Sequence, residues 1–288
     1  MQNYSIVTDS GSDISGSTLD KWGISVADLT FKFDGDEQEL VNAQMPSGEF
    51  YTRMREGGMS RTAAVNPDGF KSLFIPELEA GKDVLCLALS GGISNTADAA
   101  AQAAAELAEE YPDRKIIAID SLCASAGLGL LVYLALKKRK EGATIEENAE
   151  YIRSIIPNLC HWFTVDDLKY LARNGRISAT AAFAAGLLGI RPVLHVDNEG
   201  KLINMFKVRG RKKSLRSMAD KYSELAFDPK EGIYFISHGD CLADAKELEA
   251  MIFADHGQRA TLITDVGPVI GSHSGPGTLA LFFLGKER

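Results

Sequence analysis

Residues 84–119 read VLCLALSGGISNTADAAAQAAAELAEEYPDRKIIAI, and this stretch decides the fold class. It opens with a compact apolar run at 84–89 and closes with a second at 115–119, each of the length of a strand. A polar loop and an alanine-rich segment at 96–111, which favours a helix, lie between them. The order strand, polar loop, helix and strand predicts a mostly parallel sheet in an α/β fold.

The same order of signals recurs through the first half of the chain. Asn66-Pro67-Asp68 has the residue types that cap and begin a helix, here one that runs to Leu78. We also expect a strand at 5–7, a strand pair at 24–33, a helix ending near residue 140 and a helix at 145–155. Because the polar loops follow strands, ligands are expected at the carboxyl ends of those strands.

The second half begins after Pro157 and continues the alternation. Turn residues at 197–200 separate two strand-like runs at 191–196 and 201–208. Further on, we expect helices at 214–225 and 244–256, strands at 232–237 and 260–265, and an apolar run at 279–284. The chain is therefore predicted to form two α/β domains, at residues 1–157 and 158–288.

Composition limits the classes of partner. The chain has 288 residues, is 45% apolar, and carries 31 basic against 39 acidic residues, a formal charge of −8. This balance argues against general binding to nucleic acid or to an anionic membrane. The exception is 207–216, KVRGRKKSLR, with six basic residues, which is either a solvated charge run or a docking face for an acidic partner or a phosphate.

Neither a membrane span nor a metal site is expected from the sequence. The longest apolar stretch, 123–136, is shorter than the ~20 residues that cross a bilayer. The cysteines are far apart without a C-x-x-C pair, so they predict neither a zinc site nor a disulfide framework. The first residues lack the pattern of a secretory signal. We therefore expect a cytoplasmic protein without metal or cofactor.

The motif GPVIGSHSGPGTLALFFLG at 267–285 holds His273 between Ser272 and Ser274. We interpret its first part as a rigid glycine-rich loop, which an apolar segment backs. Such a loop can hold the polar head of a ligand beside an apolar wall. The alternative is a tight turn into a core strand, with His273 hydrogen-bonded locally.

Three further loops rich in Ser, Thr and Gly lie at 8–13, 90–96 and 120–125, which makes four with the loop at 271–277. A fifth candidate surrounds Thr62. Where a helix follows, its free N–H groups suit a carboxylate or a phosphate. The alternative for Ser94 is that it only helps to begin its helix. Ser94 with His273 also suggests an acyl hydrolase or transferase, although no G-x-S-x-G elbow is present and no carboxylate is placed to orient the histidine.

Seven motifs, taken in order, resemble one family: IVTDSGSDI at 6–14, LSGGISNTADAA at 89–100, IDSLCASAGLGLLV at 119–132, LARNGRIS at 171–178, KVRGRKKSL at 207–215, SHGD at 237–240 and GPVIGSHSGPG at 267–277. The chain resembles the DegV family, the fatty-acid-binding subunits of bacterial fatty acid kinase. The resemblance implies two α/β domains with a long-chain fatty acid in a tunnel between them. It also implies a non-catalytic carrier, whose bound carboxylate a separate ATP-dependent kinase subunit phosphorylates.

The resemblance carries over to particular residues. It implies that Thr62, Ser94 and His273 bind the carboxylate, with Gly92, Ser272, Ser274 and Gly275 as further residues of the ligand loops. It implies that Arg176, Arg209, Arg211 and Lys212 face the kinase. The chain departs from the family pattern at 63–66, Gly91, Asn95 and Ala97, which affects the expected contacts and chain length. The small residues Ala182, Ala184, Ala185 and Gly186 either leave room for the acyl chain or allow close helix packing.

Overall fold

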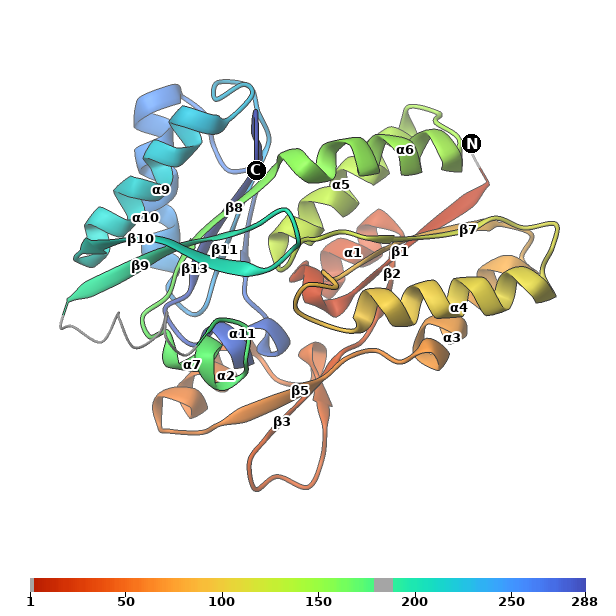
Figure 1. Cartoon of the computed structure of the whole chain (residues 1–288), viewed down its shortest axis with the longest axis horizontal. Helices are drawn as coiled ribbons and strands as arrows, with labels where there is room; N and C mark the ends of the chain where they lie inside the picture. The colour runs from red at the N-terminus through yellow and green to blue at the C-terminus, as the bar shows by residue number, and fades with distance from the viewer. Residues whose placement is uncertain (1–2, 179–188) are drawn as a thin grey trace.

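The computed structural model describes residues 3–178 and 189–288, in which three β-sheets carry helices on their faces (Figure 1). The four-stranded sheet is parallel throughout, with the order β2-β1-β6-β7. Its strands are β1 (Tyr4–Asp9), β2 (Ser25–Ala27), β6 (Asp83–Ala88) and β7 (Ile116–Asp120). The predicted α/β class and the parallel sheet of the first half are therefore confirmed.

Helices cover both faces of this sheet, α3 and α4 on one side and α5 and α6 on the other (Figure 1). Their bounds are α1 (Gly16–Trp22), α3 (Pro67–Glu79), α4 (Thr96–Glu110), α5 (Ala126–Lys140) and α6 (Ile145–Ile155). The Asn66 side chain accepts a hydrogen bond from the N–H of Gly69 and so caps α3 as predicted. None of the helices in the described part of the chain is long and apolar enough to cross a membrane.

A small antiparallel sheet, order β4-β3-β5, extends from the first half. It consists of β3 (Thr30–Phe33), β4 (Leu40–Val41) and β5 (Ser60–Ala63), and α2 (Ser47–Arg55) packs beside it. The prediction of one strand pair at 24–33 is wrong, because β2 joins the parallel sheet and β3 this one. The chain turns between them, where Leu29 N–H donates to Ser10 Oγ, and Phe31 and Phe33 then pack against Phe50 of α2.

The second half forms a six-stranded sheet with the order β10-β9-β8-β13-β11-β12. Its strands are β8 (Leu159–Thr164), β9 (Ile190–Val196), β10 (Leu202–Arg209), β11 (Tyr234–His238), β12 (Leu262–Asp265) and β13 (Leu279–Leu284). A separate apolar core joins one face of this sheet to α9 (Arg211–Leu225) and α10 (Leu242–His256). The other face packs against α5, so this helix contacts both large sheets.

Two expectations about the second half need correction. Helix α9 begins at Arg211, three residues before the predicted start at 214, so Arg211 and Lys212 belong to a helix. The expected glycine-rich loop instead contains a short helix, α11 (Pro268–Ser274). Proline at the first helical position favours this start, and Gly275 ends the helix with a φ of +80°. The remaining short elements are α7 (Lys169–Arg173) and the 3-10 turns η1 (Ser10–Ser12), η2 (Asn42–Gln44) and η3 (Ile156–Asn158).

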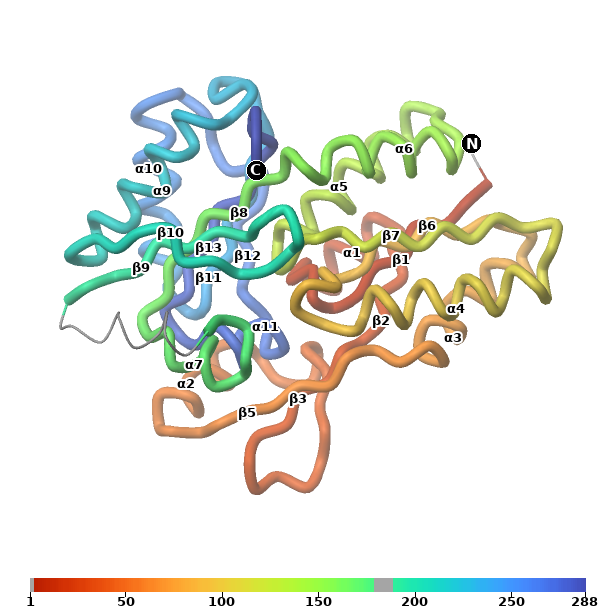
Figure 2. Tube along the Cα trace, in the orientation of Figure 1, coloured from red at the N-terminus to blue at the C-terminus, as the bar shows by residue number. Residues whose placement is uncertain are grey.

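The turn between β9 and β10 contacts the loop that follows β6. Figure 2 shows this hairpin reaching from the six-stranded sheet toward the parallel one. Ser90 Oγ donates to the carbonyl of Gly200 over 2.9 Å. Gly200 has a φ of +73°, and a β-carbon there would lie 2.0 Å from Ser90 Oγ. The contact between the two halves therefore requires glycine at this position.

Replacing Gly200 by alanine should lower the free energy of unfolding by about 2 kcal/mol or more, since backbone strain and a steric clash add. Gly257→Ala is the matched control, because Gly257 has a φ of +76° with no atom within 4 Å of the added carbon. It should cost only about 1 kcal/mol. Urea unfolding of both variants measures the difference in the free energy of unfolding. Equal losses for the two variants would show that Ser90 can move away from the added carbon at no cost.

Candidate ligand-binding cavity

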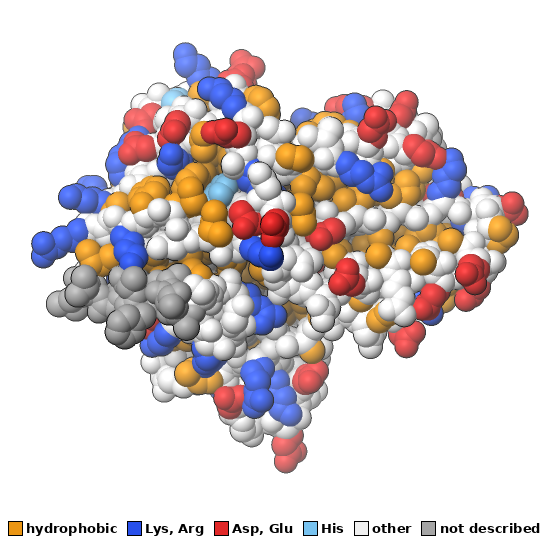
Figure 3. Space-filling view, in the orientation of Figure 1, with side chains coloured by type: hydrophobic (Ala, Val, Ile, Leu, Met, Phe, Trp, Pro, Cys, Tyr) orange, Lys and Arg blue, Asp and Glu red, His pale blue; other side chains and the backbone are white. Residues whose placement is uncertain are grey.

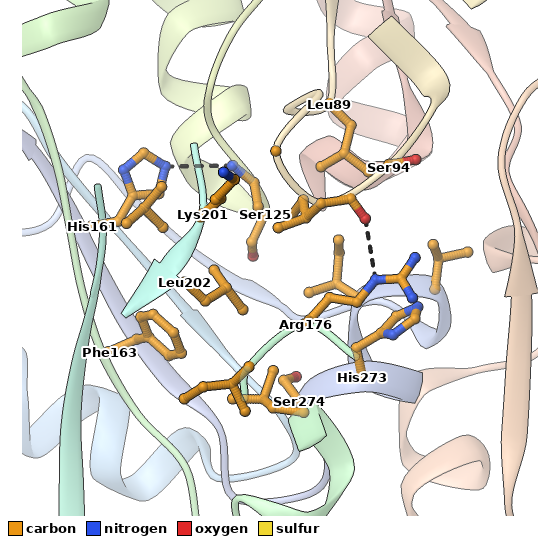
Figure 4. A pocket seen from close by; sticks show the side chains of 18 of the residues that line it. Leu89, Ser94, Ser125, His161, Phe163, Arg176, Lys201, Leu202, His273 and Ser274 are labelled. Atoms are coloured by element: carbon orange, nitrogen blue, oxygen red, sulfur yellow. Dashed lines mark hydrogen bonds between the residues drawn. The ribbon is translucent and has the colours of Figure 1, made fainter. Parts of the chain in front are cut away.

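A cavity of about 790 Å³ lies among the loops of the two halves (Figure 4). This volume falls within the roughly 300–1,000 Å³ typical of small-molecule sites. Much of its wall is apolar, formed by Leu29, Leu89, Ile93, Phe163, Leu171, Ile177, Val196, Leu202, Val266, Val269, Ile270, Ala280 and Phe282. An elongated apolar ligand would find a dry surface along this wall.

Strand alternation explains why the six-stranded sheet supplies part of this wall. Phe163 of β8, Ala280 of β13 and Ser237 of β11 lie side by side in register and all line the cavity. The next residues along these strands point to the opposite face and enter the core beneath α9 and α10. The sheet therefore separates the cavity from that second core.

The three residues expected to bind a carboxylate line this one cavity. Thr62 comes from β5, Ser94 from the loop just before α4 and His273 from the last turn of α11. Thr62 Oγ1 and His273 Nε2 are 2.8 Å apart and share a hydrogen bond. Ser94 Oγ also accepts a hydrogen bond from the N–H of Thr96. Ser94 therefore helps to begin α4 and lines the cavity at the same time.

His273 is largely buried and neutral at pH 7. Burial lowers the pKa of its imidazole to about 4, and the nearby charges of Arg176 and Arg173 add to the effect. Its Nδ1 has no hydrogen-bond partner among the described residues. If Nε2 carries the proton and donates to Thr62, the hydroxyl hydrogen of Thr62 is free to bind a ligand oxygen.

Among the described residues, the two arginines beside His273 bond to neutral acceptors. Arg176 lines the cavity and donates from Nε to the carbonyl of Ile93 over 3.1 Å, as Figure 4 shows, and from Nη1 to the carbonyl of Asn174. Arg173 donates to the Ser60 carbonyl and contacts the sulfur of Met59. No carboxylate of the described residues pairs with either guanidinium. The resulting excess of positive charge on this side of the cavity suits an anionic ligand.

Arg176 thus lies in the cavity wall, and the partner-docking role that the resemblance implies for it stays a prediction. Lys201 is a second cation in the cavity wall, and unlike Arg176 it has a carboxylate partner among the described residues. Its ammonium lies 2.6 Å from the carboxylate of Glu199, and its side chain is 58% exposed. Lys201 is thus neutralised by its neighbour, whereas Arg176 is not.

Of the four additional residues of the ligand loops, two line the cavity and two only stabilise the segment that carries His273. Ser274 and Gly92 line the cavity, and Ser274 Oγ is buried without a hydrogen-bond partner in the described structure. Ser272 lies outside the wall and hydrogen-bonds to Ser60 and to the carbonyl of Pro268. Gly275 supports the backbone, since a β-carbon there would lie 2.3 Å from the ring of Tyr170.

The three other expected docking residues lie away from the cavity, where β10 ends and α9 begins. Arg209 and Lys212 are exposed, and Figure 3 shows lysine and arginine side chains at this left edge of the molecule. Arg211 is instead engaged, with Nε 2.8 Å from Asp244 and Nη1 3.6 Å from Asp166. Ala182, Ala184, Ala185 and Gly186 lie outside the described residues.

The cavity wall also has a polar group formed by Ser125, His161 and Ser237. Sequence reasoning named the loop at 120–125 that contains Ser125, but it missed His161 and Ser237. Ser125 Oγ lies 2.5 Å from the carboxyl of Asp13 and 2.8 Å from Ser237 Oγ. Burial raises the pKa of Asp13 to about 8. The sequence did contain a signal for these two residues, because His161 and Ser237 are polar residues within mostly apolar strands.

The low pKa of His273 predicts a pH dependence of stability. The folded ring stays neutral down to about pH 4, whereas the unfolded ring takes up a proton near 6.5. Stability is therefore fully present above pH 6.5 and is lost as the pH falls toward 4, by up to about 1.4 kcal/mol per pH unit. His273→Gln should remove this part of the slope in urea unfolding across that range. A slope equal to that of the wild type would show that the ring titrates normally.

Comparison with known proteins places this architecture in a family. A family model described as an uncharacterised protein of the DegV family matches residues 3–286. A DegV domain-containing protein of Clostridium perfringens is 39% identical, with 100% of this chain and 99% of the relative covered. A Streptococcus pyogenes relative of the same description is 32% identical, with 99% of each chain covered.

Solved structures agree over the full length. A DegV lipid-binding protein of Thermotoga maritima is 28% identical with a TM-score of 0.85, and both chains are covered completely. A DegV family protein of Thermus thermophilus, described by its fatty acid binding, is 27% identical with a TM-score of 0.87, covering 99% of this chain and 100% of the other. On these grounds, the chain belongs to the DegV family.

Proposed function

We propose that the cavity binds one long-chain fatty acid, with its carboxylate beside Thr62, Ser94, His273 and Arg176 and its alkyl chain along the apolar wall. One observation carries this proposal: an arginine without an acidic partner among the described residues stands at one side of a largely apolar cavity. The lipid and fatty acid binding described for the Thermotoga and Thermus relatives supports it.

The energetics favour this class of ligand. Burying one methylene contributes about 0.8 kcal/mol, so a long alkyl chain supplies most of the affinity. The carboxylate loses its hydration and must find donors inside the protein. The Thr62 hydroxyl and the Arg176 guanidinium can supply them, and a hydrogen bond with a charged partner is about twice as strong as a neutral one.

The hydrolase alternative would need a hydrogen bond between Ser94 and His273, which these two residues do not form in the described structure. Ser94 Oγ is hydrogen-bonded to Thr96, and His273 Nε2 to Thr62, so no base activates the serine. No carboxylate orients the free Nδ1 of His273 in the described structure. A phosphorylated metabolite would satisfy Arg176 equally well, but it would leave the apolar wall without a partner. The fatty acid satisfies both.

We further propose that the protein is a carrier, which presents the bound carboxylate to a separate ATP-dependent kinase subunit in the cytoplasm. The resemblance in the basic segment supports this role, and the exposed Arg209 and Lys212 suit an acidic partner surface.

We also propose a domain boundary at 157/158, so that the fatty acid lies between domains. The strands of the six-stranded sheet all follow this position, which supports the boundary.

Arg176→Gln should weaken the binding of octadecanoate by about 10- to 100-fold, the worth of one hydrogen bond to a charged group. Binding of octadecanol, which lacks the carboxylate, should change less than about threefold. Lys201→Gln is the matched control, because it removes a cation of the same cavity that Glu199 already neutralises, and it should change neither affinity. Competition against a fluorescent fatty acid measures both ligands. Equal losses for acid and alcohol would contradict a carboxylate at Arg176.

The double charge reversal Arg209→Glu with Lys212→Glu should slow acyl-phosphate formation by the kinase at least about tenfold at low salt, while the dissociation constant for octadecanoate stays unchanged. The reversal of Lys137 and Lys140, two exposed lysines at the end of α5, changes the net charge equally and should leave the rate unchanged. A parallel loss of fatty acid binding would show that the basic segment belongs to the ligand site.

A further inference from the structure

The cavity has a second polar side, opposite the one with Arg176 and His273. Ser125, His161 and Ser237 are all at least nine-tenths buried, and all line the cavity. Figure 4 shows His161 and Ser125 across the cavity from Arg176 and His273. A plain alkyl chain forms no hydrogen bond, so a site for such a chain alone gains nothing from these groups.

The start of α5 joins the three side chains into one cluster. His161 Nδ1 donates to the carbonyl of Leu159 over 3.1 Å, so the neutral ring presents Nε2 as an acceptor. The N–H of Ala124 meets this Nε2 at 3.4 Å, a long hydrogen bond. The next residue, Ser125, contacts Ser237 Oγ at 2.8 Å.

The hydroxyl of Ser237 keeps unused hydrogen-bonding capacity in either protonation state of Asp13. When Asp13 is ionised, Ser125 donates to it and Ser237 donates to Ser125, which leaves the Ser237 oxygen free to accept. When Asp13 is protonated, the direction of donation reverses, and the Ser237 O–H is free to donate. A ligand hydroxyl group both donates and accepts, so it fits each state.

A carboxylate suits this side poorly. It only accepts hydrogen bonds, and the buried acid Asp13 stands directly behind Ser125. The guanidinium of Arg176, without an acidic partner in the described structure, is on the other side. The guanidinium charge therefore orients a fatty acid with its carboxylate at Arg176 and leaves a neutral polar group of the chain to meet Ser237.

The backbone is strained where the cluster is built. Asp13 and Ser125 have φ values of 52° and 54°, and they are two of only four non-glycine residues with positive φ in the described part of the chain. Ser125 precedes α5 but makes no capping hydrogen bond, because its side chain turns to Asp13 and Ser237 instead. Strain of this kind persists where the surroundings fix it, and it concentrates at ligand sites.

We infer that this cavity selects a fatty acid with a hydroxyl group part-way along its chain, which Ser237 and Ser125 bind from the side opposite Arg176. This inference rests on the proposed function and specifies its substrate class. In a wall without partners, a buried hydroxyl would weaken binding about 5- to 100-fold relative to the plain chain. The Ser237 hydroxyl, which Ser125 holds in place, supplies a partner and so removes that loss.

The test compares octadecanoate with 10-hydroxy-, 12-hydroxy- and 18-hydroxyoctadecanoate, each displacing a fluorescent fatty acid from the delipidated full chain. One positional isomer should bind at least as tightly as octadecanoate and about tenfold more tightly than the least favourable isomer. Ser237→Ala should leave the binding of octadecanoate unchanged and weaken the favoured isomer about tenfold. Thr278→Val, which removes another hydroxyl from the same wall, is the control and should preserve the preference.

The outcomes separate this inference from the proposed function. If octadecanoate binds and every hydroxy isomer is at least tenfold weaker, the inference is overturned and the fatty acid site stands. An isomer preference that Ser237→Ala leaves intact also overturns it, because the hydroxyl then binds elsewhere. If no fatty acid binds, both proposals fail. Ser237→Cys, which keeps an atom in the place of the hydroxyl oxygen but bonds only weakly, should weaken the favoured isomer in the same direction. The melting temperature of both variants is measured as well, so that misfolding of the alanine variant cannot imitate the expected loss.

Discussion

The buried carboxyl group of Asp13 is the interaction on which the rest of the site depends. One oxygen accepts the N–H of Gly267 over 2.9 Å, and the other accepts the hydroxyl of Ser125 over 2.5 Å. Its backbone carbonyl accepts the hydroxyl of Thr264. Helix α11 begins directly after Gly267 and α5 directly after Ser125, so one acid of the first half positions both helices. Because α11 carries His273, Asp13 also helps to place the carboxylate site that we propose.

The cavity therefore has two different polar sides. In the described structure, Arg173 and Arg176 bond to neutral acceptors near one side, whereas the hydroxyl of Ser125 contacts the buried carboxyl group of Asp13 on the other. A guanidinium without a carboxylate partner is a cost to the unliganded protein, and a carboxylate bound as proposed would remove that cost. Ligand binding and protein stability would then be coupled at Arg176.

Local chemistry made most of the helices and strands predictable. Asn66 caps α3, and Thr144 with Glu147 forms a capping box at α6, since these signals act within one turn of the chain. Thr62, Ser94 and His273 were expected together, and they share the cavity. The separation of β2 from β3 depends on Ser10, 19 positions away in sequence, so the pattern at 24–33 could not show it. Likewise, only the fold shows that Arg176 faces the cavity and that Ser237 is paired with Ser125.

Two hydrogen bonds beside the cavity join the two halves of the chain. Arg176 joins the segment after α7 to the Ile93 carbonyl, and Ser90 joins the β9–β10 turn to the loop before α4. An acyl chain bound as proposed would lie between apolar surfaces of both halves, so it would add packing between them in addition to its own affinity. Its carboxylate would share the Arg176 guanidinium with the Ile93 carbonyl. Arg176 would thereby link recognition of the head group to the contact between the two halves of the chain.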